Sequence, residues 1–459
     1  MIREVLHREL LLRPFESIVK GRRTFAYLRE LEETQWLDAD RLAALQLDRL
    51  RDILRLASSC SPYYRERWRS LRLRPDALRS LRDFAAWPVV DRETVREHRM
   101  AMRNERIPAA SLITKATGGS SGTPLVFDLD PASHERRTAA AFRGYGWAHA
   151  GPGSRQLALW GTPIGDRGLA SILKDRFYWA IQGRHVVSCF DGERDVAGRF
   201  LAELERRRPD AIVAYVNPLD EVAREIERRG EATRWAPRSI VVGAERLHDF
   251  QRERIERVFR APVHETYGSR EFMLIGAQCE RRTGLHITAD QLVVEVLDDD
   301  GTPTPRGLEG NVVVTDLFNR GMPLIRYATG DRAIAGFAAC PCGRGLPLLP
   351  CVTGRRLDML VASDGRVIPG EFFPHLVKDF PAVRRFQVIQ EEVDRVRFRL
   401  AAPELGGEDR ARLEGLVRGA LGSAMRIEFE PVDAPEAIAQ TPAGKLQVVI
   451  NRTQARRAA

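Results

Sequence analysis

The stretch SIVVGAERLHDFQRERIERVFRAPVHETYGS, residues 239–269, contains two short apolar runs separated by a charged segment. The runs SIVVGAE and PVHETYGS are typical of buried strands, and the segment between them has the apolar spacing of a helix. The same alternation occurs upstream, where residues 155–162 and 211–216 are strand-like and residues 196–209 and 219–230 are helix-like. Strands that alternate with helices predict a mainly parallel sheet with helices on its faces.

The remaining segments predict further parts of an α/β protein. Residues 38–58 have Leu and Ala at helical spacing after an Asp near the cap position. Residues 290–335 alternate in strand fashion between Gly and Pro turns, which predicts a small antiparallel, barrel-like portion. We place a domain boundary at about residue 356, with a large N-terminal domain over 1–355 and a small mixed α/β domain over 356–459.

The composition limits the possible partners and location. The chain has 459 residues, of which 29% are charged, and its formal net charge is +9. Basic and acidic residues are interleaved and aromatic residues are scarce, so we expect no nucleic-acid partner. No run approaches the ~18 apolar residues of a membrane helix, and the N-terminal MIREVLHRELLLRPF lacks the apolar core of a signal peptide. We therefore expect a cytoplasmic protein without a membrane span, whose positive charge favours anionic ligands such as nucleotides.

Residues 114–127, TKATGGSSGTPLVF, form a loop rich in Gly, Ser and Thr. A Walker loop needs a Lys directly after its last Gly, but here Gly122 is followed by Thr123. The glycine spacing also differs from the G-x-G-x-x-G of a Rossmann turn. Successive backbone N–H groups and hydroxyls can wrap an anion, so the segment is a phosphate loop or a flexible linker.

Five landmarks follow one another along the chain. They are the loop itself, Gly243-Ala244-Glu245, the run from Glu265 to Glu271 (ETYGSRE), the run from Tyr327 to Asp331 (YATGD), and Gly354-Arg355 followed by Pro442-Ala443-Gly444-Lys445. In this order they closely resemble the adenylate-forming superfamily of acyl-CoA synthetases, adenylation domains and luciferases. Within it the chain looks most like the phenylacetate–CoA ligases and the adenylate-forming proteins of capsule-type gene clusters. The resemblance extends over nearly the whole chain.

The resemblance implies a binding site for ATP. In such a site the loop holds the β- and γ-phosphates, Tyr267 and residues 243–245 border the adenine, Asp331 accepts from the ribose hydroxyls, and Arg355 contacts the nucleotide. The implied ATP and AMP ligands are Thr117, Gly118, Gly119, Ser120, Ser121, Gly122, Thr123, Gly243, Ala244, Glu245, Tyr267, Gly268, Ser269, Asp331 and Arg355.

The resemblance also implies three catalytic residues. Lys445, on a mobile C-terminal domain, would bridge the substrate carboxylate and the phosphate, and a Lys is notable in a chain that strongly prefers Arg. Glu271 matches the glutamate that binds Mg²⁺. Arg270 stands where the superfamily usually has Thr, and its position favours contact with the α-phosphate or the acyl carboxylate. Leu357 replaces the usual hinge Asp, which leaves the extent of domain rotation open.

Cys279, His286, Cys340 and Cys342 have the side chains of a closed tetrahedral zinc site. The resemblance favours a structural zinc ion, because some members of this branch carry a metal here. Buried cysteines with a core histidine are the alternative, and Cys351 is a spare ligand.

The implied reaction joins a small carboxylic acid to ATP, giving an acyl-adenylate and pyrophosphate, and then passes the acyl group to coenzyme A. Transfer to an amine or to a carrier-protein phosphopantetheine is the alternative within the class, and a non-catalytic nucleotide-binding or scaffold protein is the alternative outside it. Dimers are common in this branch, so a homodimer is possible. Tyr145, Trp147, Trp160 and Tyr215 lie near segments that can line the acid pocket, although core packing explains most such residues.

Overall fold

The computed structural model describes residues 2–117, 125–160, 169–189, 195–355, 360–363, 367–368, 372–377, 380, 382–383, 385–402, 405–422, 424–433, 437–438 and 448–453. The chain forms two compact units. The first comprises Met1–Thr117, Pro124–Thr329 and Ala333–Thr353, and the second comprises Gly118–Thr123, Gly330–Arg332 and Gly354–Ala459.

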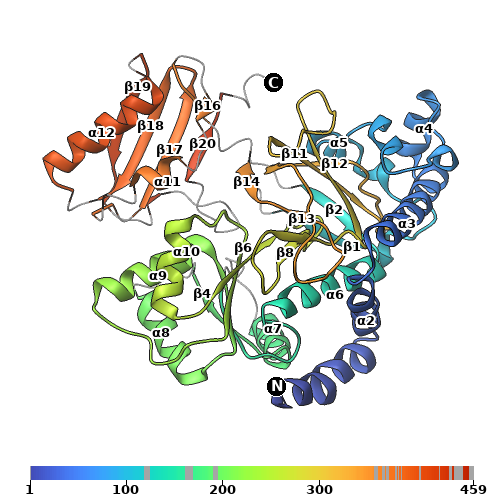
Figure 1. The fold of residues 1–459 in the computed structure, drawn as a ribbon, viewed down its shortest axis with the longest axis horizontal. Helices are drawn as coiled ribbons and strands as arrows, with labels where there is room; N and C mark the ends of the chain where they lie inside the picture. The colour runs from blue at the N-terminus through green and yellow to red at the C-terminus, as the bar shows by residue number, and fades with distance from the viewer. Residues whose placement is uncertain are drawn as a thin grey trace. The chain divides into compact units, whose positions relative to one another are not determined.

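An eight-stranded sheet lies at the centre of the first unit, in the order β13-β9-β8-β7-β6-β5-β3-β4 (Figure 1). The strands from β4 to β7 pair in parallel, whereas β8, β9 and β13 are added antiparallel. Strands β5 and β6 are buried at every position, as expected for a parallel sheet covered on both faces. The bounds are β3 (Gln156–Trp160), β4 (Arg184–Ser188), β5 (Ala211–Tyr215), β6 (Ser239–Gly243), β7 (Val263–Tyr267), β8 (Gly276–Gln278), β9 (Leu285–Ile287) and β13 (Leu348–Leu349).

Three helices cover one face of this sheet (Figure 1). Their apolar residues, such as Phe200 and Phe259, pack on Leu159 and Ile212 of the strands in one hydrophobic core. The predicted alternation of strands and helices is therefore confirmed. The bounds are α6 (Pro131–Trp147), α7 (Leu169–Ile181), α8 (Val196–Arg207), α9 (Val216–Arg228) and α10 (Asp249–Phe259), and α8 to α10 are the three covering helices.

The N-terminal part of the first unit is helical. The helix predicted over 38–58 is α3 (Ala39–Cys60), and it begins at Asp38 because the Asp38 carboxylate accepts a hydrogen bond from the backbone N–H of Arg41. The other helical elements here are α1 (Ile2–His7), η1 (Arg8–Leu12), η2 (Phe15–Val19), α2 (Thr24–Thr34), α4 (Pro62–Ser70), η3 (Pro75–Ala77), η4 (Asp83–Ala86), α5 (Arg92–Met102) and η5 (Ala109–Ser111).

Two smaller sheets complete this part of the chain. The hairpin β1 (Ile113–Ala116) and β2 (Val126–Leu129) flanks the Gly-rich loop. The segment predicted to be antiparallel contributes to a four-stranded sheet in the order β10-β11-β12-β14, with β10 and β11 antiparallel. Its strands are β10 (Leu292–Leu297), β11 (Glu309–Asp316), β12 (Tyr327–Ile334) and β14 (Val352–Arg355).

The second unit has its own hydrophobic core, built around Phe373, Val388 and Phe398. Its four-stranded sheet has the order β19-β18-β17-β20, with a β17–β18 hairpin and parallel outer strands. The bounds are β15 (Leu360–Val361), β16 (Val367–Ile368), α11 (Phe372–Val377), β17 (Arg385–Glu392), β18 (Arg395–Ala401), α12 (Gly407–Leu421), β19 (Arg426–Pro431) and β20 (Val449–Asn451). The predicted α/β class is confirmed in both units.

Candidate active site

The β1–β2 hairpin fixes both ends of the Gly-rich loop. The Thr117 N–H donates to the Leu125 carbonyl at 2.9 Å, and the Thr117 hydroxyl oxygen accepts from the Leu125 N–H at 2.9 Å. Arg92 Nη2 donates to the same hydroxyl oxygen at 2.8 Å. The predicted phosphate ligands Gly118, Gly119, Ser120, Ser121, Gly122 and Thr123 lie outside the described residues.

Positive charge gathers beside the base of this loop. We call Lys115, His134, Arg137, Arg270 and Arg22 the basic cluster. Lys115 Nζ lies 3.3 Å from His134 Nδ1. Burial, with Arg137, Arg270 and Arg22 nearby, lowers the pKa of Lys115 to about 8, and burial beside Lys115 lowers the pKa of His134 to about 4. At neutral pH Lys115 is charged and His134 is neutral, so the cluster favours binding of an anion.

Residues 243–245 lie at the carboxyl end of β6, where parallel sheets bind ligands. A Cβ on Gly243 would lie 2.5 Å from the Thr266 hydroxyl oxygen, so the close approach of β7 requires a glycine. Ala244 has a φ of 70°, in the left-handed region that non-glycine residues rarely adopt and that is concentrated at functional sites. The Glu245 carboxylate accepts a hydrogen bond from the Asn217 N–H at 2.8 Å.

The run 267–271 begins at the carboxyl end of the neighbouring strand, β7. Tyr267 is buried and pairs with Gly276 of β8. At Gly268 a Cβ would lie 1.9 Å from the Met273 carbonyl oxygen, so only glycine allows this turn. Ser269 Oγ accepts from the Phe272 N–H at 3.3 Å. Arg270 is exposed, and its Nε donates to the Ala116 carbonyl of β1 at 3.3 Å, so the run lies beside the base of the loop.

Glu271 is buried, and its carboxylate has one partner among the residues that the structure describes. The Tyr327 hydroxyl donates to Glu271 Oε1 at 3.2 Å, which leaves Oε2 without a hydrogen bond within the described ranges. Arg137 donates to the Glu271 backbone carbonyl. Asp331 is buried on β12, the strand that begins at Tyr327. Sequence reasoning assigned no role to Tyr327, although its place at the start of the 327–331 landmark was the available signal.

Three residues of the second unit that the sequence singled out have no described side chain. Arg355 ends β14, but only its backbone is described. Lys445 and Leu357 lie outside the described residues, so their predicted roles stay predictions.

The four predicted zinc ligands lie together at the antiparallel end of the large sheet. One ligand atom from each of Cys279, His286, Cys340 and Cys342 lies within 4.8 Å of every other. Cys279 Sγ and Cys340 Sγ are 3.7 Å apart, and Cys342 Sγ is 3.3 Å from His286 Nε2. The spare candidate Cys351 is an exposed cysteine that does not belong to this cluster.

The hydrogen bonds around this Cys/His cluster have the pattern of metal ligands. His286 Nδ1 lies 3.0 Å from the Leu346 carbonyl, so Nδ1 carries the hydrogen and the Nε2 lone pair faces the sulfurs. The backbone N–H of Arg281 donates to Cys279 Sγ at 3.4 Å, and that of Arg344 donates to Cys342 Sγ at 3.5 Å. Burial raises the pKa of the Cys279 thiol, so a metal ion would have to displace its proton.

Comparisons with known proteins agree with this arrangement. Residues 360–452 match the family model of the CapK C-terminal domain. Phenylacetate-coenzyme A ligase of Thermus thermophilus is 26% identical over 371 residues, which are 78% of this chain and 80% of that protein. Protein CapK of Staphylococcus aureus is 22% identical and matches 74% of each chain. Over about three quarters of its length the chain is therefore similar to phenylacetate–CoA ligases and to Protein CapK.

These similarities confirm the predicted resemblance. The fold of this chain is shared by 2-hydroxyisobutyryl-CoA ligase, solved in the postadenylation state in complex with R3-HIB-AMP, with a TM-score of 0.73 at 22% identity over 93% of both chains. Within the described part of the chain, no helix has the length and apolar character needed to cross a bilayer.

The aromatic residues expected near an acid pocket separate into two groups. Tyr145 and Trp160 line a cavity in the first unit, and Tyr215 packs on Trp160 with ring centroids 4.0 Å apart. Trp147 instead lies 5.3 Å from the His286 ring, beside the Cys/His cluster. Arg184, which also lines the cavity, was missed because it begins an ordinary strand pattern, RHVVS.

Proposed function

We propose that the protein is an ATP-dependent, AMP-forming carboxylate ligase of the acid–thiol type. The proposal rests on two features of neighbouring residues, Arg270 and Glu271. Arg270 joins the run 267–271 to β1, beside Lys115 and the base of the Gly-rich loop. The next residue, Glu271, has a buried carboxylate that is suited to a metal ion.

The basic cluster has the charge needed to bring a carboxylate to a triphosphate. Both substrates are anions, so the main obstacle is their mutual repulsion. Protonated Lys115 with Arg270 would neutralise part of the phosphate charge. Arg92 and Leu125 hold Thr117, the residue that precedes Gly118, through hydrogen bonds to its hydroxyl oxygen. The sequence resemblance adds Lys445 of the domain 356–459 as the residue that bridges carboxylate and phosphate.

Glu271 fits the role of a Mg²⁺ ligand. Tyr327 orients the carboxylate through Oε1, and Oε2 is left to contact a metal ion. When bound, Mg²⁺ would draw charge from the phosphate oxygens, using one carboxylate and otherwise water and phosphate. In this proposal Tyr267 and residues 243–245 border the adenine, and Asp331 accepts hydrogen bonds from the ribose hydroxyls.

Coenzyme A is the acceptor that the relatives favour, since they are named as coenzyme A ligases. In the second half-reaction the thiolate attacks the acyl carbon, the C–S bond forms, and AMP leaves with the electron pair of the cleaved C–O bond. An amine or a carrier-protein thiol can attack in the same way, so the acceptor has to be measured.

The test is carboxylate-dependent exchange of labelled pyrophosphate into ATP across a panel of acids. We expect exchange that requires both the acid and Mg²⁺, followed by thioester formation when coenzyme A is added. Adding amines or carrier proteins instead measures the alternative acceptors. Nucleotide binding without exchange, for any acid, would support the scaffold alternative.

We also propose that Cys279, His286, Cys340 and Cys342 bind a structural zinc ion. Three thiolates and one imidazole with satisfied outer hydrogen bonds form a closed site with no open position for a substrate. Such a site contributes folding free energy, because it ties β8 and β9 to the segment that contains Cys340 and Cys342.

A further inference from the structure

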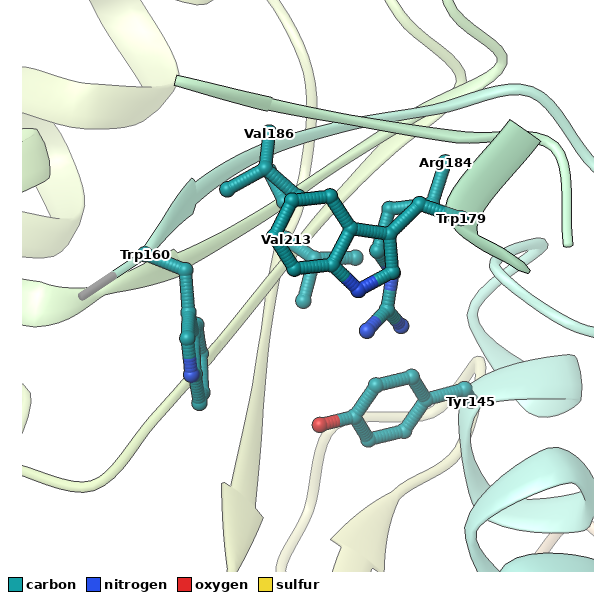
Figure 2. Close-up of a pocket in the computed structure, with 7 residues that line it drawn as sticks. Tyr145, Trp160, Trp179, Arg184, Val186 and Val213 are labelled. Carbon is teal, nitrogen blue, oxygen red and sulfur yellow. The ribbon is translucent and has the colours of Figure 1, made fainter. Parts of the chain in front are cut away.

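A cavity of about 80 Å³ lies in the first unit among side chains of α6, α7, β3, β4 and β5. Figure 2 shows three aromatic side chains, Tyr145, Trp160 and Trp179, around the space, and the guanidinium group of Arg184 points between Trp179 and Tyr145. An apolar cavity of about 150 Å³ holds benzene. This cavity therefore fits a smaller group, about the size of a carboxylate and the carbons next to it.

The Arg184 guanidinium has an unusually small set of partners. Its Nε and Nη2 donate to the same oxygen, Gln156 Oε1, at 3.1 and 3.0 Å. The Gln156 amide cannot turn round, because its Nε2 donates to the Ala150 carbonyl at 2.7 Å and to Ser154 Oγ at 3.1 Å. Within the part of the chain that the structure describes, no carboxylate forms an ion pair with Arg184, and Nη1 has no hydrogen-bond partner.

This environment is costly for a cation. A guanidinium stays protonated in proteins, so it cannot escape burial by losing its proton. Arg184 is half-buried, and this partial burial lowers its pKa; the neutral amide oxygen of Gln156 compensates only part of the lost hydration. A carboxylate in the cavity would accept hydrogen bonds from the remaining N–H groups in charge-assisted geometry. The flat walls of Trp160 and Trp179 would exclude water and strengthen that contact.

The cavity borders the proposed activation site. The Tyr145 hydroxyl lies near the Thr266 side chain, one residue before Tyr267. Thr266 lies against Gly243, and Trp160 packs on Tyr215, which pairs with Gly243 in the sheet. Two residues that line the cavity, Trp160 and Tyr145, therefore lie next to the strand neighbours of Gly243.

We propose that the activated acid carries a second carboxylate, which Arg184 binds in this cavity, so that the substrate is a compact dicarboxylic acid. This inference rests on the proposed function, because it places the distal end of the same acid. Arg184 is then a specificity-determining residue: it contacts the end of the substrate away from the carboxyl group that forms the adenylate.

The experiment compares each diacid with its monoamide in pyrophosphate exchange, using glutarate against glutaramate and terephthalate against terephthalamate. The amide has nearly the same shape but no second charge. For at least one pair we expect the wild-type kcat/KM to be about 10- to 100-fold higher for the diacid, the range for a hydrogen-bonded buried charge. Arg184→Gln is expected to abolish this ratio mainly through KM, and Arg184→Lys, which keeps the charge, to retain part of it.

Arg176→Gln is the matched control, because Arg176 is an exposed arginine on neighbouring α7. It is expected to leave the ratio unchanged. Exchange that shows no preference for any diacid over its monoamide, or a preference that Arg184→Gln retains, would overturn the inference while the proposed function stands. Absence of exchange with every acid would contradict the proposed function itself. Circular dichroism of each variant separates a folding defect from a change in specificity.

Discussion

At the scale of single residues, the account depends on Glu271 and Lys115. Both were within reach of sequence reasoning, since Glu271 ends a landmark motif and Lys115 directly precedes the Gly-rich loop. The residues that contact Glu271 and Lys115 could not be predicted from the sequence. The contacts of Lys115 with His134 and of Glu271 with Tyr327 join residues 19 and 56 positions apart, and only the fold brings them together.

Glu271→Gln is expected to lower the pyrophosphate exchange rate by at least about 100-fold, as removal of one group that stabilises transition-state charge typically does. Glutamine keeps an acceptor for the Tyr327 hydroxyl, so the fold and its melting temperature should be retained. Exchange rates at saturating Mg²⁺ measure the effect. The exposed Glu253 offers a control, Glu253→Gln, which should behave as wild type; a wild-type rate in Glu271→Gln would remove Glu271 from the site.

ATP affinity is expected to fall as pH rises through about 8. The pKa of Lys115 is lowered to about 8 in the free protein, so the ammonium loses its proton above that pH, whereas bound phosphate favours the protonated form. The affinity should therefore drop by up to roughly tenfold between pH 8 and pH 9.

Binding titrations of ATP between pH 7 and pH 9.5 measure this dependence. Lys115→Met should bind ATP more weakly at pH 7 and lose the decline above pH 8. Lys20→Met, at an exposed lysine, should keep the wild-type profile. An identical pH profile in Lys115→Met would show that another group titrates.

At the scale of elements, the alternation of apolar runs and helical segments was sufficient to predict β3, β5, β6 and β7 together with the helices α8, α9 and α10. The order of the strands within the sheet was harder to predict from the sequence. The position of β4 beyond β3, at the edge of the sheet, depends on packing between segments and not on local pattern. For the same reason Arg184 appears in the sequence as an ordinary strand residue, although the fold places it in a cavity.

The Cys/His cluster is the element-scale feature with the most direct test. Cys279→Ser is expected to lose bound zinc and to lower the melting temperature by several degrees, because the metal ties separate segments together. Metal analysis and thermal unfolding measure the two effects. Cys351→Ser changes an exposed cysteine outside the cluster and should alter neither. If the wild-type protein contains no zinc and Cys279→Ser has the same melting temperature, the cluster consists of ordinary buried cysteines with a core histidine.

At the scale of the whole molecule, the protein consists of two units with separate hydrophobic cores. The family resemblance predicted which landmark residues to group together, but the sequence alone could not identify the acid, because pocket walls come from β3, β4, α6 and α7 at once. The proposal assigns the bridging lysine, Lys445, to the small domain and the binding of ATP to the large one.

Lys445→Ala is expected to reduce pyrophosphate exchange by at least about 100-fold while ATP binding changes little, because the lysine acts on the reacting carboxylate and phosphate. Titration calorimetry and exchange kinetics separate the two effects. Lys174→Ala, at an exposed lysine of α7, should show wild-type exchange. Equal loss of binding and exchange would make Lys445 a general ATP ligand.

The most direct test of the central claim is pyrophosphate exchange into ATP by the wild-type protein, with and without a carboxylic acid. The account predicts exchange that depends on the acid and on Mg²⁺, with AMP as the product once an acceptor thiol is supplied. Release of ADP and phosphate, or exchange that is absent with every acid while ATP binds, would contradict it.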